Sequence, residues 1–277
     1  MGIYQITNFD PRAIAASGQC FRMLETAPGQ VEAIALNRHL VITCLAQDSF
    51  EFSCSDNEFQ TVWQPYFDLQ TDYGAYLSAV DETDAYLLEA AHLGQGLRIL
   101  RQDPWETLIS FILSQRKSIP AIRDSIEKLC RYLGNPLSIK DRQVYAFPSP
   151  EAIASAPQEV LKSCSVGYRG PYIQATAQAV AQGKIDLSAL FGLDDDALRD
   201  SLLSFCGVGV KVAHCVMLFG YHRLGSAPVD VWIQRVIDLH YGGTSPFDRY
   251  PGIAGVMQQY MFYERMLKKR GLSGPAA

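Results

Sequence analysis

The sequence predicts an α+β fold, in which an N-terminal antiparallel β-sheet domain is followed by a mostly α-helical bundle containing a helix–hairpin–helix motif. Short β-branched and aromatic runs, separated by polar turns, fill residues 18–55. From about residue 69 the apolar residues recur at spacings of three and four, which is the helical period. We therefore expect a sheet domain over residues 1–68 and a helical domain over residues 69–277.

The expected strands lie in residues 18–26 and 30–55. The second segment reads QVEAIALNRHLVITCLAQDSFEFSCS and is interrupted at LNRH and at AQDS. Polar residues and asparagine or aspartate at such interruptions are typical of tight turns between paired strands. The pattern therefore predicts consecutive antiparallel strands through about residue 68.

The first core helix is expected at DPWETLISFILSQ. Asp103 is a favourable N-cap, Pro104 suits the first helical position, and Glu106 completes a capping box. Further helices are expected at residues 119–134, 149–156, 157–164, 169–183, 195–205, 210–222, 229–243 and 252–269. Their short connections predict one packed bundle.

Composition and charge restrict the class of protein. The chain has a net charge of −5, which by itself argues against nucleic acid as a partner because phosphates attract Lys and Arg. Positive residues nevertheless cluster at SQRKSIPAIR (114–123) and ERMLKKRG (264–271), so a locally basic face is expected. No apolar run is long enough to span a bilayer, and the first residues do not resemble a secretory signal. We expect no membrane partner and a cytoplasmic protein, associated with the nucleoid if the source is bacterial.

The cysteines and histidines predict neither disulfides nor a metal site. Seven cysteines are present, an odd number, and none forms a Cys-x-x-Cys pair. The five histidines form no pair with metal-ligand spacing. We expect reduced thiols, no metal and no cofactor.

The segment FCGVGVKVAHC predicts a helix–hairpin–helix. Gly207 and Gly209 permit positive φ and a close approach of another backbone. The first amides of the second helix, from Gly209 through Val210 to Lys211, have no intrahelical partners, so they form an anion site that suits a DNA phosphate. An ordinary turn with a glycine C-cap is the alternative.

Lys211 lies in the first turn of the second helix, where the helix dipole disfavours a positive charge. Cys215 and Leu218 follow on the same helix face, so the amine leaves a partly apolar surface. Both effects favour the neutral amine that a covalent nucleophile requires. The alternative is a surface lysine whose aliphatic stem covers apolar neighbours.

The loop APVDVW can return Asp230 to Lys211. The helix from Lys211 to His222 rises by about 16 Å, and the seven residues 223–229 span at most about 23 Å. Pro228 stiffens this approach, and Asp230 is a favourable N-cap for the next helix. Capping is compatible with a second role, in which the carboxylate stabilises positive charge on a sugar.

Four further segments, in the same order along the chain, complete a resemblance. The hairpin and GVGVKVAHC…PVDVW resemble the helix–hairpin–helix DNA glycosylases, and within them the 8-oxoguanine DNA glycosylases. The segment SGQCFRM resembles that family's SGQSFRW, and ILRQDPWETLISFI resembles its first bundle helix. VGYRGPYI resembles LGYRARYV, and AGVMQQYMF resembles AGWAQAVLF. The resemblance covers most of the chain and implies a bifunctional DNA glycosylase and AP lyase that removes 8-oxoguanine from double-stranded DNA as a monomer.

The resemblance assigns roles to catalytic and base-binding residues. Lys211 corresponds to the Schiff-base lysine and Asp230 to the catalytic aspartate. The residues implied to bind the damaged base are Gly18 through its carbonyl, Cys215 beside the lysine, Gln258 at the pairing edge of the base, Phe262 by stacking, and Pro228.

The DNA contacts implied by the resemblance include two departures from the family pattern. Tyr168 corresponds to the residue that fills the gap left by the flipped base, and Arg169 to one that contacts the orphaned cytosine. Arg116 replaces an asparagine that faces this cytosine, and an arginine can still donate to it. Trp232 replaces a histidine that contacts a phosphate. The hairpin's usual proline is Cys206.

Other interpretations remain at this point. An alkylpurine glycosylase of the same fold generally lacks the lysine, so Lys211, Gly18 and Gln258 argue against it. A non-catalytic helix–hairpin–helix DNA-binding protein would not depend on Asp230 and would form no covalent complex. A structural scaffold is favoured by the acidic charge alone.

Overall fold

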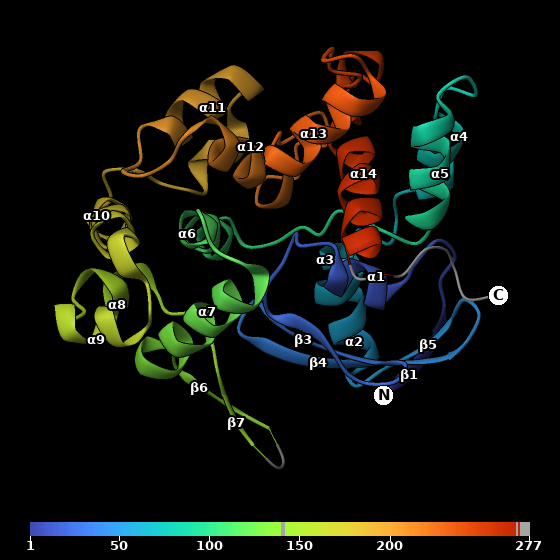
Figure 1. Cartoon of the computed structure of the whole chain (residues 1–277). Helices are drawn as coiled ribbons and strands as arrows, with labels where there is room; N and C mark the ends of the chain where they lie inside the picture. The colour runs from blue at the N-terminus through green and yellow to red at the C-terminus, as the bar shows by residue number, and fades with distance from the viewer. Residues whose placement is uncertain (140–141, 270, 272–277) are drawn as a thin grey trace.

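The computed structural model describes residues 1–139, 142–269 and 271. It contains a five-stranded antiparallel sheet in the order β1-β5-β4-β3-β2, beside and below a large helical region (Figure 1). The strands are β1 (Gly2–Gln5), β2 (Met23–Ala27), β3 (Gln30–Ala35), β4 (Arg38–Ala46) and β5 (Ser49–Phe52). The predicted α+β class is confirmed.

The turns between the central strands form where the sequence interruptions predicted them. Leu36 and Asn37, between β3 and β4, have φ angles of 52° and 58°, as expected for a two-residue hairpin of primed type. Asp48, between β4 and β5, also has a positive φ of 57°. β1 was not predicted, and it pairs along its whole length with β5.

Each helix that the sequence predicted corresponds to a helix in the structure. They are α1 (Pro11–Ala16), α2 (Asp56–Glu58), α3 (Gln64–Tyr66), α4 (Tyr73–Ser78), α5 (Ala85–Leu93), α6 (Pro104–Ser114), α7 (Ile119–Leu133), α8 (Pro150–Ala154), α9 (Gln158–Ser163), α10 (Gly170–Ala181), α11 (Asp195–Leu203), α12 (Val210–Phe219), α13 (Val231–His240) and α14 (Ala254–Lys269), with a π-helical turn η1 (Phe59–Trp63) and 3-10 turns η2 (Gly167–Arg169), η3 (Ala189–Gly192) and η4 (Phe247–Arg249). A small hairpin, β6 (Pro136–Ser138) and β7 (Gln143–Tyr145), was not predicted. The expected domain boundary at residue 68 falls between α3 and α4 and stays a prediction.

At the start of α6 the structure confirms the expected N-cap at Asp103 but not the expected capping box with Glu106. The Asp103 carboxylate accepts a hydrogen bond from the Trp105 amide at 3.0 Å, as an N-cap should. Glu106 does not complete a capping box in the hydrogen bonds of the described residues. Its side chain instead lies near Arg22, Asp103 and Glu127, and burial, aided by the two other carboxylates, raises its pKa to about 7.

The packing of the helices brings four distant segments together. α12 packs against α6 and α11, while α14 packs against α5 and α13 and touches α1. In Figure 1, α14 stands between the sheet domain and the helices α11 to α13. The end of α1, the start of α12, the start of α13 and the middle of α14 therefore meet at the functional site. No helix in the described part of the chain is both long and apolar enough to cross a membrane.

Candidate active site

The turn between α11 and α12 forms the expected hairpin, but its two glycines differ. Gly207 has a φ of 80°, and a Cβ there would lie 2.5 Å from Cδ2 of Tyr172, so glycine is required by the protein itself. Gly209 has a φ of −102°, which corrects the expectation of a positive φ at both positions. A Cβ on Gly209 would meet nothing within 4 Å in the described structure.

The N-terminus of α12 is open. Gly209 is its N-cap residue and supplies no side-chain cap in the described structure, and the side chain of Val210 is 62% exposed. The first amides of α12 are therefore available to an external anion. Because the protein leaves free space at Gly209, a backbone phosphate can approach these amides closely.

Lys211 lies between an aromatic ring and a thiol. Its Nζ is 5.3 Å from the centroid of the Phe111 ring. Burial raises the pKa of the Cys215 thiol, and the charge of Lys211 and a hydrogen bond from it oppose this rise. Cys215 is 3% exposed, so the thiol is a neutral neighbour on the inner side of the amine.

Asp230 performs the capping role that the sequence predicted. Its Oδ1 accepts hydrogen bonds from the amides of Trp232 and Ile233, both at 2.9 Å. Both Asp230 and Lys211 lie in the described part of the chain, and no ion pair within 4.0 Å joins them there. The helix cap, rather than the lysine, therefore fixes the position of the carboxylate.

One pocket contains all seven residues that the sequence assigned to catalysis and base binding. Its volume is about 50 Å³. It is lined by Gly18, Lys211, Cys215, Pro228, Asp230, Gln258 and Phe262, together with Phe111, Phe219 and Gln259. The pocket is narrow on one side, because a Cβ on Gly18 would lie 3.0 Å from Cε1 of Phe262. Gly18 has a φ of 76°, which glycine adopts without strain.

Sequence reasoning missed three lining residues. Phe111 and Phe219 stack at 5.4 Å between centroids, with 17° between their planes. Phe219 follows Cys215 by four residues, so helical spacing could have identified it. Gln259 is buried at 4% exposure, and only its adjacency to Gln258 hinted at it.

Tyr168 is exposed at the surface, whereas its neighbour Arg169 is buried. Tyr168 is 51% exposed on the η2 turn, where it is free to contact DNA. Arg169 is 5% exposed and lies 4.3 Å from the centroid of the Tyr168 ring. Its guanidinium donates a hydrogen bond to the carbonyl of Gln115. In this structure Arg169 therefore supports the loop after α6, and its expected contact with the orphaned cytosine stays a prediction.

That loop presents Arg116. Arg116 directly follows the braced Gln115 carbonyl, is exposed and has a φ of 51°. The Gln115 side chain donates to the carbonyl of Gly207 at 2.9 Å. The loop after α6, the η2 turn and the hairpin are therefore joined through Gln115.

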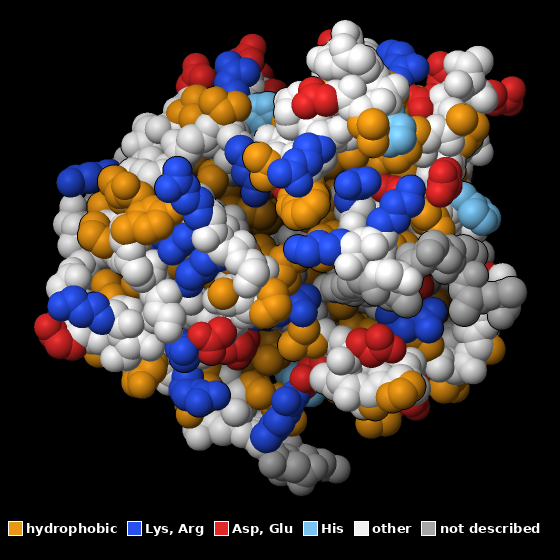
Figure 2. All heavy atoms as spheres, viewed as in Figure 1, with side chains coloured by type: hydrophobic (Ala, Val, Ile, Leu, Met, Phe, Trp, Pro, Cys, Tyr) orange, Lys and Arg blue, Asp and Glu red, His pale blue; other side chains and the backbone are white. Residues whose placement is uncertain are grey.

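Trp232, where the family has a histidine, lies against two cations. Arg235 is 5.2 Å and Lys269 5.1 Å from the centroid of the indole ring. The indole therefore assembles positive charge two residues after Asp230. Figure 2 shows Lys and Arg side chains gathered around a hollowed, partly hydrophobic area on the face seen in Figure 1. The basic face expected from the sequence is consistent with this view; Arg270 lies outside the described residues.

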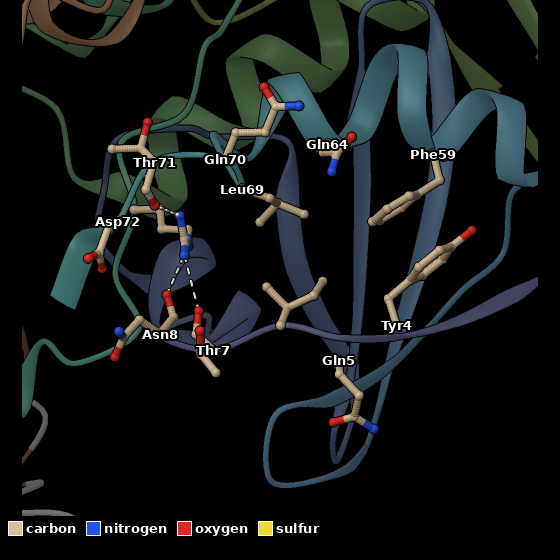
Figure 3. A pocket seen from close by; sticks show the side chains of 12 residues that line it. Tyr4, Gln5, Thr7, Asn8, Phe59, Gln64, Leu69, Gln70, Thr71 and Asp72 are labelled. Atoms are coloured by element: carbon tan, nitrogen blue, oxygen red, sulfur yellow. Dashed lines mark hydrogen bonds between the residues drawn. The ribbon is translucent and has the colours of Figure 1, made fainter.

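A larger hollow lies in the sheet domain (Figure 3). It has a volume of about 450 Å³, and its side chains include the stacked rings of Tyr4 and Phe59 and the amides of Gln64 and Gln70. Arg98 is 3% exposed there and donates to four backbone carbonyls, those of Thr7, Asn8, Asp68 and Thr71. We name it the N-terminal hollow; its arginine has a structural role.

Among the described residues, no cluster of three or more His, Cys, Asp and Glu side chains is placed to hold a metal ion. The site offers an amine, a fixed carboxylate, a flat aromatic wall and an open helix N-terminus. Together these features are typical of the helix–hairpin–helix class of DNA glycosylases, which act on a nucleotide extruded from the duplex.

Comparisons with known proteins agree with this class. The family model described as the HhH-GPD superfamily base excision DNA repair protein matches residues 109–248, and that of the 8-oxoguanine DNA glycosylase N-terminal domain matches residues 3–108. The probable N-glycosylase/DNA lyase of Methanothermobacter thermautotrophicus is 31% identical over 226 residues, which cover 71% of each chain.

Two solved structures are similar over nearly the whole chain. One is described as MBOgg1 in complex with a low affinity DNA ligand; it is 36% identical with a TM-score of 0.91, covering 97% of this chain and 96% of that one. The other is the Clostridium acetobutylicum 8-oxoguanine glycosylase/lyase in complex with double-stranded DNA containing cytosine opposite 8-oxoguanine, 30% identical with a TM-score of 0.89, covering 96% and 93%. The chain belongs to the HhH-GPD superfamily of base excision DNA repair proteins, and within it to the 8-oxoguanine DNA glycosylases.

Proposed function

We propose that this DNA-binding enzyme removes 8-oxoguanine from duplex DNA through a Schiff base on Lys211 and then cleaves the strand at the resulting abasic site. The observation that carries the proposal is the pocket itself, where Lys211 and Asp230 lie on the same lining as Phe262 and Gln258. An amine nucleophile and a carboxylate that stabilises a cationic sugar are what this chemistry requires.

Recognition begins with extrusion of the damaged nucleotide, which costs a few kcal/mol. The exposed Tyr168 fills the gap in the base stack. Phosphates of the strand bind the open amides of α12 at Gly209 and Val210, and Arg116 reaches the unpaired cytosine. The flipped base enters between Phe262 and Cys215, which requires the Phe262 ring to move away from Gly18.

In the chemical step the Lys211 Nζ attacks C1′ of the sugar. The C1′–N9 bond breaks, and the base leaves with its electron pair and accepts the proton that the amine releases. Asp230 stabilises the positive charge that develops on the sugar. Opening of the sugar ring gives an imine, and loss of a C2′ proton then expels the 3′ phosphate by β-elimination.

The test is trapping with borohydride, which reduces the imine to a stable covalent complex. The wild-type protein should be trapped on duplex DNA containing 8-oxoguanine opposite cytosine, and Lys211→Gln should abolish trapping. Lys184→Gln, at an exposed lysine outside the pocket, is the matched control and should be trapped like the wild type. Trapping of the Lys211→Gln variant would assign the nucleophile to another residue.

We also propose that the protein acts as a monomer in the cytoplasm. A single chain supplies every lining residue of the pocket, so the chemistry needs no second copy. Sedimentation of the protein with and without duplex DNA tests this, and a dimer on a single lesion site would contradict it. Cell fractionation tests the location.

A further inference from the structure

Gln259 is a buried amide on the pocket wall with an unused acceptor. It is 4% exposed, and its Nε2 donates to Oε1 of Gln258 at 3.0 Å. Its own Oε1 has no hydrogen-bond partner in the described structure. Buried polar atoms are nearly always paired, and leaving one unpaired costs about 1–3 kcal/mol. An acceptor left open beside a substrate pocket therefore indicates a donor on the substrate.

The bond between the two glutamines determines which polar groups remain for a ligand. Gln258 uses its oxygen to accept from Gln259, so its N–H groups remain as donors. Gln259 uses its nitrogen, so its oxygen remains as an acceptor. The pair therefore offers a donor and an acceptor on neighbouring residues of α14, which line the same pocket as Lys211 and Cys215.

The pairing edge of an oxidised guanine complements this arrangement. It carries an acceptor at O6 and donors at N1 and at the exocyclic 2-amino group, and the 2-amino group is what sets guanine apart from other purines. We propose that Gln259 is a specificity-determining residue whose Oε1 accepts a hydrogen bond from the 2-amino group of the flipped base. The related segment AGWAQAVLF has alanine at this position.

This inference rests on the proposed function. It predicts that the enzyme prefers bases that carry the 2-amino group, because Gln259 Oε1 needs a donor. When the 2-amino group is absent, Gln259 Oε1 remains buried and unpaired, so the transition state loses stabilisation. The wild type should therefore excise 8-oxoguanine about tenfold faster than 8-oxohypoxanthine, which lacks only the 2-amino group.

The experiment measures single-turnover excision of both bases, each opposite cytosine, by the wild type, Gln259→Met and Gln259→Ala. Methionine keeps most of the side-chain volume and removes the strong acceptor, and alanine is a second variant should methionine disturb folding. In both variants the ratio of the two rates should fall from about ten towards one. Thermal unfolding identifies any variant that does not fold.

The possible outcomes distinguish the proposed glycosylase function from the proposed role of Gln259. A wild type that excises neither base would overturn the proposed function. A wild type that excises both bases equally, or a folded variant that keeps the wild-type ratio, would overturn the role of Gln259 and leave the glycosylase function intact.

Discussion

The N-terminal hollow is larger than the active-site pocket, but the smaller pocket contains the reactive and unpaired polar groups. The N-terminal hollow has a volume of about 450 Å³ and the active-site pocket one of about 50 Å³. In the hollow the buried cation, Arg98, donates hydrogen bonds to four backbone carbonyls. In the pocket Lys211 has soft neighbours, the Phe111 ring and the Cys215 thiol, and Gln259 has an unpaired oxygen. Unsatisfied groups, rather than empty volume, distinguish the reactive site.

Among variants that test the contrast between the hollow and the pocket, we expect the largest effect, on the rate of base excision, from a change at Asp230. Asn caps a helix about as well as Asp, so Asp230→Asn should keep the fold while removing the charge. We expect base excision to slow by about 10²–10³-fold, since charge stabilisation of this kind is a large term in catalysis. Single-turnover kinetics and thermal unfolding measure the two effects separately.

Asp194 offers the matched control. It caps α11, where its side chain accepts from the Ala197 amide at 2.8 Å, and it lies outside the pocket. Asp194→Asn should leave both stability and excision close to the wild type. Equal loss of excision in the two variants would show that Asp230 acts only as a cap.

The next effect compares an aromatic ring from each region. Phe262→Leu removes the flat surface for the flipped base, and stacking of a base on such a ring contributes about 1–3 kcal/mol. We expect excision of 8-oxoguanine to slow about tenfold. Phe59→Leu, which breaks the stack with Tyr4 in the N-terminal hollow, should lower the melting temperature with little effect on the excision rate of the folded protein. Similar kinetic losses in both would remove Phe262 from base recognition.

A smaller effect concerns stability at Glu106, which lies outside both regions and lines a small cavity with Arg22 and Asp103. Because burial raises its pKa to about 7, the folded state binds a proton more tightly than the unfolded state. Stability therefore falls as pH rises from about 4.5 to 7, and ionisation costs most above pH 7. Glu106→Gln should be more stable than the wild type by about 2 kcal/mol at pH 8 and nearly equal to it at pH 4.5. Denaturant unfolding at the two pH values tests this; a difference independent of pH would contradict it.

The smallest effect is expected in the N-terminal hollow itself. Gln70 is an exposed amide on its rim. Gln70→Ala should change stability by less than about 0.5 kcal/mol and leave excision unchanged. A marked loss of excision in this variant would mean that the hollow takes part in the reaction, and the contrast between the two regions would fail.

The two proposed catalytic residues of the pocket were predictable from short local patterns, whereas the base-binding roles of the other residues followed only from the family resemblance. Lys211 and Asp230 were found from a glycine turn, a cap and the length of one loop, and the structure places both on one pocket. The central strands were found from their own alternation and turns. β1 was missed because four residues carry little pattern, and its partner β5 lies more than forty residues away.

Arg169 and Gln259 show where sequence reasoning ended. A guanidinium has five N–H donors, and whether they face DNA or a carbonyl depends on the packing of residues far apart in the sequence. For Arg169 the deciding partner is Gln115, 54 positions away. Gln259 was missed because one amide next to another forms no pattern, and only burial and the unpaired oxygen identify it.

The position of Gln115 has a mechanical consequence. Its carbonyl is held from the turn that carries Tyr168, and its amide holds the backbone of the phosphate-binding hairpin. Two hydrogen bonds therefore couple the η2 turn to the hairpin through one residue. In the complex with DNA that we propose, we expect this coupling to keep Tyr168 and the open amides of α12 at a nearly constant distance from each other.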